Sequence, residues 1–212
     1  MNTKLIILNT DGVILDKELA LANAITTIIK NKFKINISAK EYQQSYLYTP
    51  KDQVLKRLQS KAPKMKDSIC IDEILKEANH NYSGSLNATE NITQVLQTLE
   101  KNGVIIAAYT INRENYFKEL LKQQNLQEYI THFVCSENED NLFKAISNLC
   151  DKINVVTKEV TIVSSNTEDI EHFNNFNVKC IGYSKNSNAR VKFKMAGANL
   201  DLKIIERLPL VI

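Results

Sequence analysis

Three polar residues directly follow the first apolar run of the chain. The stretch LIILNTDGVILD (5 to 16) is apolar up to Asn9, Thr10 and Asp11, and it becomes apolar again after Gly12. A carboxylate such as that of Asp11 can transfer protons, and amide and hydroxyl groups can bind an anion. Asp and Gly are also common turn residues, so this pair could equally serve only to turn the chain out of a strand.

Two later apolar runs end in residues of similar kinds. The run in AAYTINREN (107 to 115) ends at Thr110, and VTIVSSNTEDI (160 to 170) carries Ser165 at the end of its run and Asp169 just beyond. In an open parallel sheet, ligands bind outside the carboxyl ends of the strands. The pattern therefore predicts that these side chains face one site, together with those at 9 to 12.

Short apolar runs and helix-like segments alternate along most of the chain. Because Val and Ile are frequent in the runs, we expect buried strands there. Strand-helix alternation is typical of an α/β fold with a Rossmann-like parallel sheet core. The expected strands are 4–9, 103–109, 132–136, 159–165 and 178–183, and the helices between the last four are near 112–125, 139–152 and 167–175.

A long insertion separates the first two expected strands. Most of it looks helical, including 17–33 and 52–59. We therefore expect a helical cap domain of residues 16–87, inserted into a core domain of residues 1–15 and 88–212. The segment 88–103 is expected to be a core helix that ends at Gly103, because glycine commonly follows the last helical turn.

Composition excludes several classes of protein. The 212 residues are 43% hydrophobic and 24% charged, which is typical of a globular chain and not of a disordered one. The net charge of +3 is too small to favour nucleic acid as a partner. No apolar run approaches the roughly 20 residues that cross a bilayer, and no secretory signal is recognised, so we expect a cytoplasmic protein without a membrane anchor.

The cysteines and one basic stretch have simple interpretations. Cys70, Cys135, Cys150 and Cys180 form none of the close pairs that zinc sites use, so we expect buried, reduced thiols. The stretch 49–66 is basic, which is typical of a solvated helix face, although it could also bind RNA or an acidic protein. Its basic residues are Lys51, Lys56, Arg57, Lys61, Lys64 and Lys66.

These motifs together resemble the haloacid dehalogenase superfamily of phosphatases, over nearly the whole chain. The family pattern is D-x-D-G-[TV] after the first strand, Thr or Ser after the second, then a Lys, and finally G-D-x-x-x-D. The helical insertion looks like the cap of the phosphoglycolate phosphatase and β-phosphoglucomutase branch. The resemblance implies a small phosphorylated metabolite as substrate or ligand, and magnesium as cofactor.

The resemblance also implies a role for each matching residue. Asn9 stands at the position of the nucleophilic Asp, and Asp11 stands at that of the acid/base. The phosphate-binding positions are Thr10, Gly12, Thr110 and Asn112. The magnesium positions are Asn9, Asp11 through its backbone carbonyl, Ser165 and Asp169.

Three motif positions depart from the family pattern. Asn9 and Ser165 replace carboxylates, which weakens a site for a hard dication. Ser136 or Glu137 stands where the Lys belongs, and Lys144 or Lys158 could substitute for it. We therefore expect lost or much reduced phosphatase activity. The alternatives are a weak hydrolase that uses Asp11, and a non-catalytic module that binds a phosphometabolite or another protein; a homo-oligomer is also open.

Overall fold

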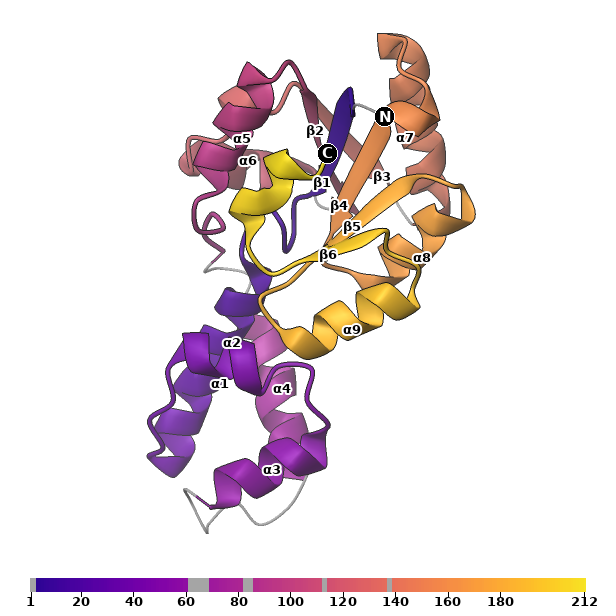
Figure 1. The fold of residues 1–212 in the computed structure, drawn as a ribbon. Coiled ribbons are helices and arrows are strands. Elements are labelled where there is room, and N and C mark those ends of the chain that lie inside the picture. Colours follow the sequence, from indigo (N-terminus) through magenta and orange to yellow (C-terminus); the bar gives the residue numbers. More distant parts are fainter. Residues whose placement is uncertain (1–2, 61–68, 82–85, 112–113, 137–138) are drawn as a thin grey trace. The chain divides into compact units, whose positions relative to one another are not determined.

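The computed structural model describes residues 3–60, 69–81, 86–111, 114–136 and 139–212. Its centre is a parallel sheet with the strand order β3-β2-β1-β4-β5-β6 (Figure 1). This arrangement confirms the predicted α/β class with a Rossmann-like core. The strands are β1 Leu5–Asn9, β2 Ile105–Ile111, β3 His132–Ser136, β4 Val160–Ser164, β5 Lys179–Tyr183 and β6 Leu200–Leu202.

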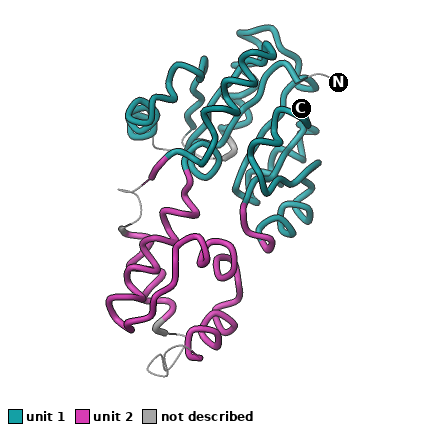
Figure 2. Tube along the Cα trace, turned by 60° about the vertical axis from the view of Figure 1, so that its left-hand side comes forward, with its two compact units in different colours: residues 1–15, 88–184, 189–212 teal, residues 16–87, 185–188 magenta. Residues whose placement is uncertain are grey.

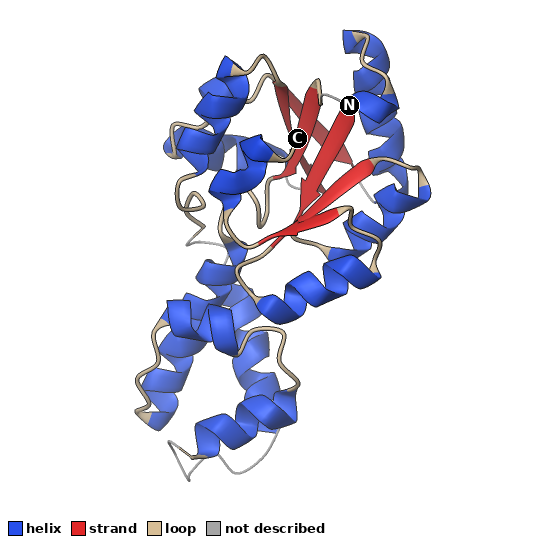
Figure 3. Cartoon of the chain, in the orientation of Figure 1, coloured by secondary structure: helices blue, strands red, loops and turns tan. Residues whose placement is uncertain are grey.

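Helices cover both faces of this sheet, as Figure 3 shows. A parallel sheet needs this cover because its strands are apolar on both faces. The helices that pack on the sheet are α5 Ile92–Lys101, α6 Glu114–Gln123, α7 Glu139–Ile153, α8 Thr167–Asn175 and α9 Ser187–Met195. Between β1 and β2 in the chain lie α1 Lys17–Phe33, α2 Ala39–Ser45, α3 Lys51–Gln59 and α4 Ile69–Asn81. Short 3-10 helices are η2 Gln127–Tyr129, η3 Thr157–Glu159 and η4 Ile205–Leu210.

The two faces of the sheet build two separate apolar clusters. Along β1, Ile6 and Leu8 pack into the cluster that contains residues of α5, α6 and η4. Leu5 and Ile7 pack into the other cluster, with residues of α7, α8 and α9. Because side chains alternate along a strand, odd-numbered residues of β1 point towards α8. This alternation sets the direction of Asn9, the last residue of the strand.

The chain divides into two compact units, coloured in Figure 2. The first contains the sheet and comprises Met1–Leu15, Ala88–Ser184 and Ala189–Ile212. The second is helical and comprises Asp16–Asn87 together with the short segment Lys185–Asn188. That the helical unit acts as a cap stays a prediction.

The helical unit has its own apolar core, and hydrogen bonds attach the segment 185–188 to it. Apolar residues of α1 to α4 form the core, with Ile25, Ile29 and Leu58 almost fully buried. The buried Asn186 side chain donates from Nδ2 to the carbonyl oxygens of Gln43 (2.9 Å) and Leu47 (2.7 Å). These carbonyls flank the C-terminal end of α2, where backbone acceptors have no helical partner. Asn186 therefore fixes the segment to α2.

Candidate functional site

The parallel strands bring their last residues to one edge of the sheet. Asn9 at the end of β1 pairs in register with Tyr109 of β2. On the other side of β1, Leu8 pairs with Val163 of β4, so that Ser164 ends β4 beside Asn9. This edge is where the sequence predicts a site, and where ligands bind in open parallel sheets.

Asp169 on α8 lies at the centre of a buried hydrogen-bond network at this edge. Its side chain is 2% exposed. Its Oδ2 accepts hydrogen bonds from Asn9 Nδ2 (3.1 Å), from Ser164 Oγ (2.8 Å) and from the Tyr109 hydroxyl. Its Oδ1 accepts a longer one from Asn166 Nδ2 (3.4 Å). Four side-chain donors therefore compensate one buried carboxylate, which would otherwise be costly to bury.

Strand alternation explains why Asn9 and Tyr109 meet Asp169. Both residues continue the odd-numbered face of their strands, which packs on α7, α8 and α9. The N-cap of α8 is Asn166, whose side chain accepts from the Glu168 amide at 3.1 Å. This cap starts α8 directly after β4, so Asp169 falls in the first turn, above the ends of β1 and β2.

Tyr109 belongs to the site although sequence reasoning missed it. The side chain is fully buried, and burial, followed by the charge of Asp169, raises the pKa of the phenol well above its usual range. The phenol therefore remains a hydrogen-bond donor at any ordinary pH. In the sequence, Tyr109 is indistinguishable from the other apolar residues of the strand. Only its position directly before Thr110, on the same strand face as Asn9, could have indicated its role.

The loop after β1 is closed by its own backbone. The Gly12 amide donates to the Leu15 carbonyl (2.8 Å), and the Leu15 amide donates to the Thr10 carbonyl (3.0 Å). The Thr10 amide donates to the Tyr109 carbonyl (2.9 Å). The amides of Thr10 and Gly12 are thus engaged within the protein, and a ligand here would have to use other groups of the loop.

Ser165 lies against this loop. Its hydroxyl donates to the backbone carbonyl of Asp11 at 3.3 Å. A Cβ atom added to Gly12 would lie 1.9 Å from Ser165 Oγ, and Gly12 has φ +119°. Glycine is therefore required at position 12 both by the backbone conformation and by this close approach.

Buried side-chain oxygens at the edge include two, on Asn9 and Thr10, that have no hydrogen-bond partner within the described residues. These two atoms are Asn9 Oδ1 and Thr10 Oγ1, in side chains 9% and 0% exposed. Buried polar groups are normally satisfied, so these atoms are candidates for contact with a ligand. Thr110 lies at the same edge, near the end of β2, and is 4% exposed. Asn112, the remaining predicted phosphate-binding residue, lies outside the described residues.

The donor set does not fit a magnesium ion. Mg²⁺ prefers anionic oxygens in octahedral arrangement, whereas Asn9 and Ser165 here contribute an amide and a hydroxyl. Both groups direct a hydrogen atom at the oxygens that remain, Asp169 Oδ2 and the Asp11 carbonyl. In the part of the chain that the structure describes, no three histidine, cysteine or acidic side chains gather as ligands.

The structure excludes one substitute for the missing motif Lys. Lys158 lies in η3, near the amino end of β4, and about 16 Å of strand separates it from the polar edge. Lys144 lies on α7, which follows the carboxyl end of β3, and its side chain is exposed. Ser136 ends β3 at the polar edge and is buried, and Glu137 is not among the described residues.

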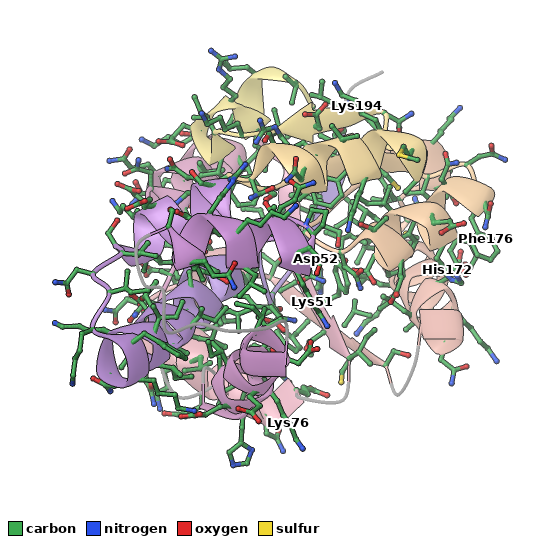
Figure 4. The ribbon with its side chains drawn as sticks, turned by 90° about the horizontal axis from the view of Figure 1, so that it is seen from below. Lys51, Asp52, Lys76, His172, Phe176 and Lys194 are labelled. Carbon is green, nitrogen blue, oxygen red and sulfur yellow. The ribbon has the colours of Figure 1, made fainter. Side chains whose placement is uncertain are left out.

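Two of the basic residues at 51–57 already have partners inside the helical unit. Lys51, labelled in Figure 4, pairs with Asp72 of α4. Arg57 donates to the Ser45 carbonyl at 3.0 Å and lies over the Tyr46 ring. Lys61, Lys64 and Lys66 are outside the described residues. The described basic residues, Lys51, Lys56 and Arg57, are all exposed, which agrees with a solvated helix face; that this face binds RNA or an acidic protein stays untested.

The described cysteines only partly match the expected buried thiols, because Cys135 is half-buried. Cys135, Cys150 and Cys180 are free thiols, the last two buried. Burial, with a smaller effect of the Asp169 charge, raises the pKa of Cys180 to about 12.

No helix within the described ranges has the length and apolarity to cross a bilayer.

Comparison with known proteins gives a family and a fold. The model of the haloacid dehalogenase-like hydrolase family matches residues 6–183. A comparison with curated proteins finds no match. Among solved structures, a conserved haloacid dehalogenase-like protein of unknown function from Agrobacterium tumefaciens is 16% identical, with a TM-score of 0.66 and coverage of 99% of this chain and 97% of that one.

Two further structures have similar folds. A predicted phosphoglycolate phosphatase from Haemophilus somnus is 14% identical, with a TM-score of 0.63 over 100% of this chain and 98% of its own. A HAD-family hydrolase from Deinococcus radiodurans, determined with bound phosphate and sodium, is 15% identical, with a TM-score of 0.63 over 97% and 93%. The family match spans most of the chain and the fold agrees with it, which confirms the resemblance seen in the motifs: this chain belongs to the haloacid dehalogenase-like hydrolases.

Proposed function

We propose that this protein binds a small phosphorylated metabolite at the polar edge of its sheet and has lost, or largely lost, covalent phosphatase activity. The observation that carries the proposal is the state of Asn9, whose amide stands at the nucleophile position and donates to Asp169. The haloacid dehalogenase-like family supports a phosphorylated ligand. The Deinococcus radiodurans structure, with its bound phosphate, supports the same class of ligand.

The chemistry of an amide explains the proposed loss of turnover. An aspartate attacks phosphorus with a charged oxygen, whereas the amide oxygen of Asn9 is neutral and its nitrogen is held as a donor. Removing the nucleophile of a well-studied protease lowers turnover on the order of a millionfold, and we expect a loss of comparable size here. The missing motif Lys would deepen this loss, because a lysine at that position neutralises part of the phosphate charge.

Binding can persist where turnover does not. The buried hydroxyl of Thr10 can donate to a phosphate oxygen, and it has no competing partner within the described residues. Thr110, close by at the end of β2, is proposed to add a second hydroxyl. We propose that this binding needs no magnesium, since the donor set does not suit the cation. The helical unit of residues 16–87 is proposed to act as the cap over the bound ligand.

A phosphate-release assay and calorimetry together test this proposal. The natural chain is assayed with phosphoglycolate and a panel of sugar phosphates, beside Asp11→Ala and beside the pair Asn9→Asp with Ser165→Asp. We expect the natural chain to bind at least one of these esters with measurable heat and to release no phosphate. Gln94→Glu, an amide-to-carboxylate change on the exposed face of α5, is the matched control and should behave as the natural chain.

Two outcomes would contradict the proposal. Phosphate release by the natural chain that disappears in Asp11→Ala would show an enzyme in which Asp11 assists attack by water. Failure to bind any of these esters, and failure to bind inorganic phosphate, would contradict the proposed phosphorylated ligand. Phosphate release that begins only in the restored pair would support a preserved scaffold that lacks its reactive carboxylates.

A further inference from the structure

The two substituted motif positions make hydrogen bonds to the two metal-binding groups that are retained. Asn9, where the family pattern has a carboxylate, donates to Asp169 Oδ2 at 3.1 Å. Ser165, where the pattern has another, donates to the Asp11 carbonyl at 3.3 Å. Each change thus replaces an acceptor with a donor, and each donor points at an oxygen that would otherwise face a cation.

These two hydrogen bonds reduce the repulsion between neighbouring oxygen atoms at the edge of the sheet. Carboxylates and a carbonyl packed at such distances repel each other unless a cation lies between them. Once two of the four groups are donors, the same oxygens are held by charge-assisted or neutral hydrogen bonds. Hydrogen bonds then hold three elements together without an ion: β4, α8 and the loop that follows β1. The close approach of Ser165 to Gly12 is part of the same contact.

Tyr109 extends the replacement to the next strand. Its hydroxyl and that of Ser164 also donate to Asp169 Oδ2, so one carboxylate oxygen accepts from β2, β1 and β4. The centre of the network is therefore the negative Asp169 carboxylate, and the side chains around it are hydrogen-bond donors. A cation site has the opposite arrangement, with a positive centre and acceptors around it.

We propose that this chain has replaced the divalent cation of its family with an internal anion, the Asp169 carboxylate, which gathers donors from three adjacent strands. The strand ends are then organised without magnesium, and the family's metal position has no affinity for it. This replacement holds whether or not a phosphate ester binds, because all of its contacts lie within the protein.

Cation binding and thermal unfolding test the proposal directly. Mn²⁺ serves as the probe, with bound and free ion separated by electron paramagnetic resonance. The melting temperature is measured in EDTA and in Mg²⁺. For the natural chain we expect no saturable Mn²⁺ binding and the same melting temperature in both solutions. For Asn9→Asp with Ser165→Asp we expect a lower melting temperature in EDTA, recovery in Mg²⁺, and stoichiometric Mn²⁺ binding.

The controls keep each result interpretable. Gln94→Glu adds one exposed carboxylate and should leave both measurements unchanged. Saturable Mn²⁺ binding by the natural chain that is lost in Asp169→Asn would overturn the proposal, and this measurement does not depend on whether the double variant folds. A folded double variant that binds no Mn²⁺ would also overturn it, as would a Tyr109→Phe variant whose lost stability is restored by Mg²⁺.

Discussion

Gly12 and Ser165 approach each other so closely that no side chain fits between them. A Cβ atom on Gly12 would lie 1.9 Å from Ser165 Oγ and 2.8 Å from its Cβ. The φ angle of Gly12, +119°, adds a backbone conformation that other residues rarely adopt. The loop after β1 and the end of β4 are therefore fitted to each other at this point.

We expect Gly12→Ala to destabilise the protein by more than about 2 kcal/mol, because overpacking and positive φ each cost on the order of 1–2 kcal/mol. Gly103→Ala is the matched control, since Gly103 has φ +74° and open space around a new Cβ. Urea unfolding of both variants separates the clash from the strain. Equal losses in the two variants would show that the contact with Ser165 is unimportant.

Tyr109→Phe should lower the free energy of unfolding by about 1–3 kcal/mol, because it removes one donor from the buried Asp169 carboxylate. Tyr129→Phe is a suitable comparison: its hydroxyl accepts from Gln97 Nε2 at 3.0 Å, between neutral groups at a partly buried position. We expect the smaller loss there. Denaturant titrations give both values, and a Tyr109→Phe variant as stable as the natural chain would argue against a structural role for the phenol.

The central strands of the sheet could be predicted because β1 and β4 are apolar runs buried at every position, whereas the short edge strand β6, which begins with an exposed residue, was not among the expected strands. The expected helix 17–33 matches α1, whose N-cap Asp16 accepts from the Leu19 amide. Helix α2 was missed, although Ser38 followed by Glu41 is a capping-box pattern and the Ser38 side chain does cap the helix. The short length of α2 gave too few apolar positions for a periodicity to show.

The site was only partly predictable for a different reason. Asn9 and Asp11 carry polar side chains directly after an apolar run, so the sequence indicates them directly, whereas Asp169 lies in a polar stretch and is indicated by the spacing of the fourth family motif. Tyr109 contributes through one hydroxyl on an otherwise apolar ring, and its partner is 60 residues away on α8. Only the register of β1 with β2, and the start of α8 after β4, bring that hydroxyl to Asp169.

Asn186→Asp should destabilise the helical unit more than Asn186→Ala does. Alanine removes the donors to the carbonyls of Gln43 and Leu47, and also the Oδ1 acceptor of the Asn188 amide (2.8 Å), which aspartate keeps, at a cost of about 1–3 kcal/mol. Aspartate removes the same donors and also places a buried charge against those carbonyl oxygens, which we expect to raise the cost to about 3–5 kcal/mol. Asn188→Asp, an exposed site in the same segment, is the control. Hydrogen exchange of α2 and thermal unfolding measure the effect, and equal losses for Ala and Asp would contradict it.

Ionisation of the Tyr42 phenol should lower the free energy of unfolding at alkaline pH. Burial, followed by the nearby Tyr46, raises the pKa of this phenol from 10.0 to about 12. Because the folded pKa is the higher one, this contribution is complete below pH 10 and is lost as pH rises towards 12, by about 3 kcal/mol in all. Tyr42→Phe should remove that part of the pH dependence, whereas the exposed Tyr48→Phe should not. Denaturant unfolding between pH 9 and pH 12 provides the test; parallel slopes for all three proteins would refute it.

Thr10→Val separates binding from stability at the polar edge. The Thr10 hydroxyl is buried with no hydrogen-bond partner within the described residues, so an isosteric apolar side chain should leave stability unchanged or raise it by about 1 kcal/mol. If the same hydroxyl binds the proposed phosphate, affinity for a phosphate ester should fall about tenfold, the equivalent of one hydrogen bond of about 1.4 kcal/mol.

The matched control for Thr10→Val lies at the opposite end of the sheet. Thr161 is also fully buried, but its hydroxyl is hydrogen-bonded to that of Thr3 at 2.8 Å. Thr161→Val should therefore lose stability and keep its affinity, which is the reverse pattern. Calorimetric titration with phosphoglycolate and thermal unfolding of both variants measure the two quantities. Unchanged affinity in Thr10→Val would mean that this hydroxyl does not contact the ligand, and phosphate binding at this edge would then depend on Thr110 instead.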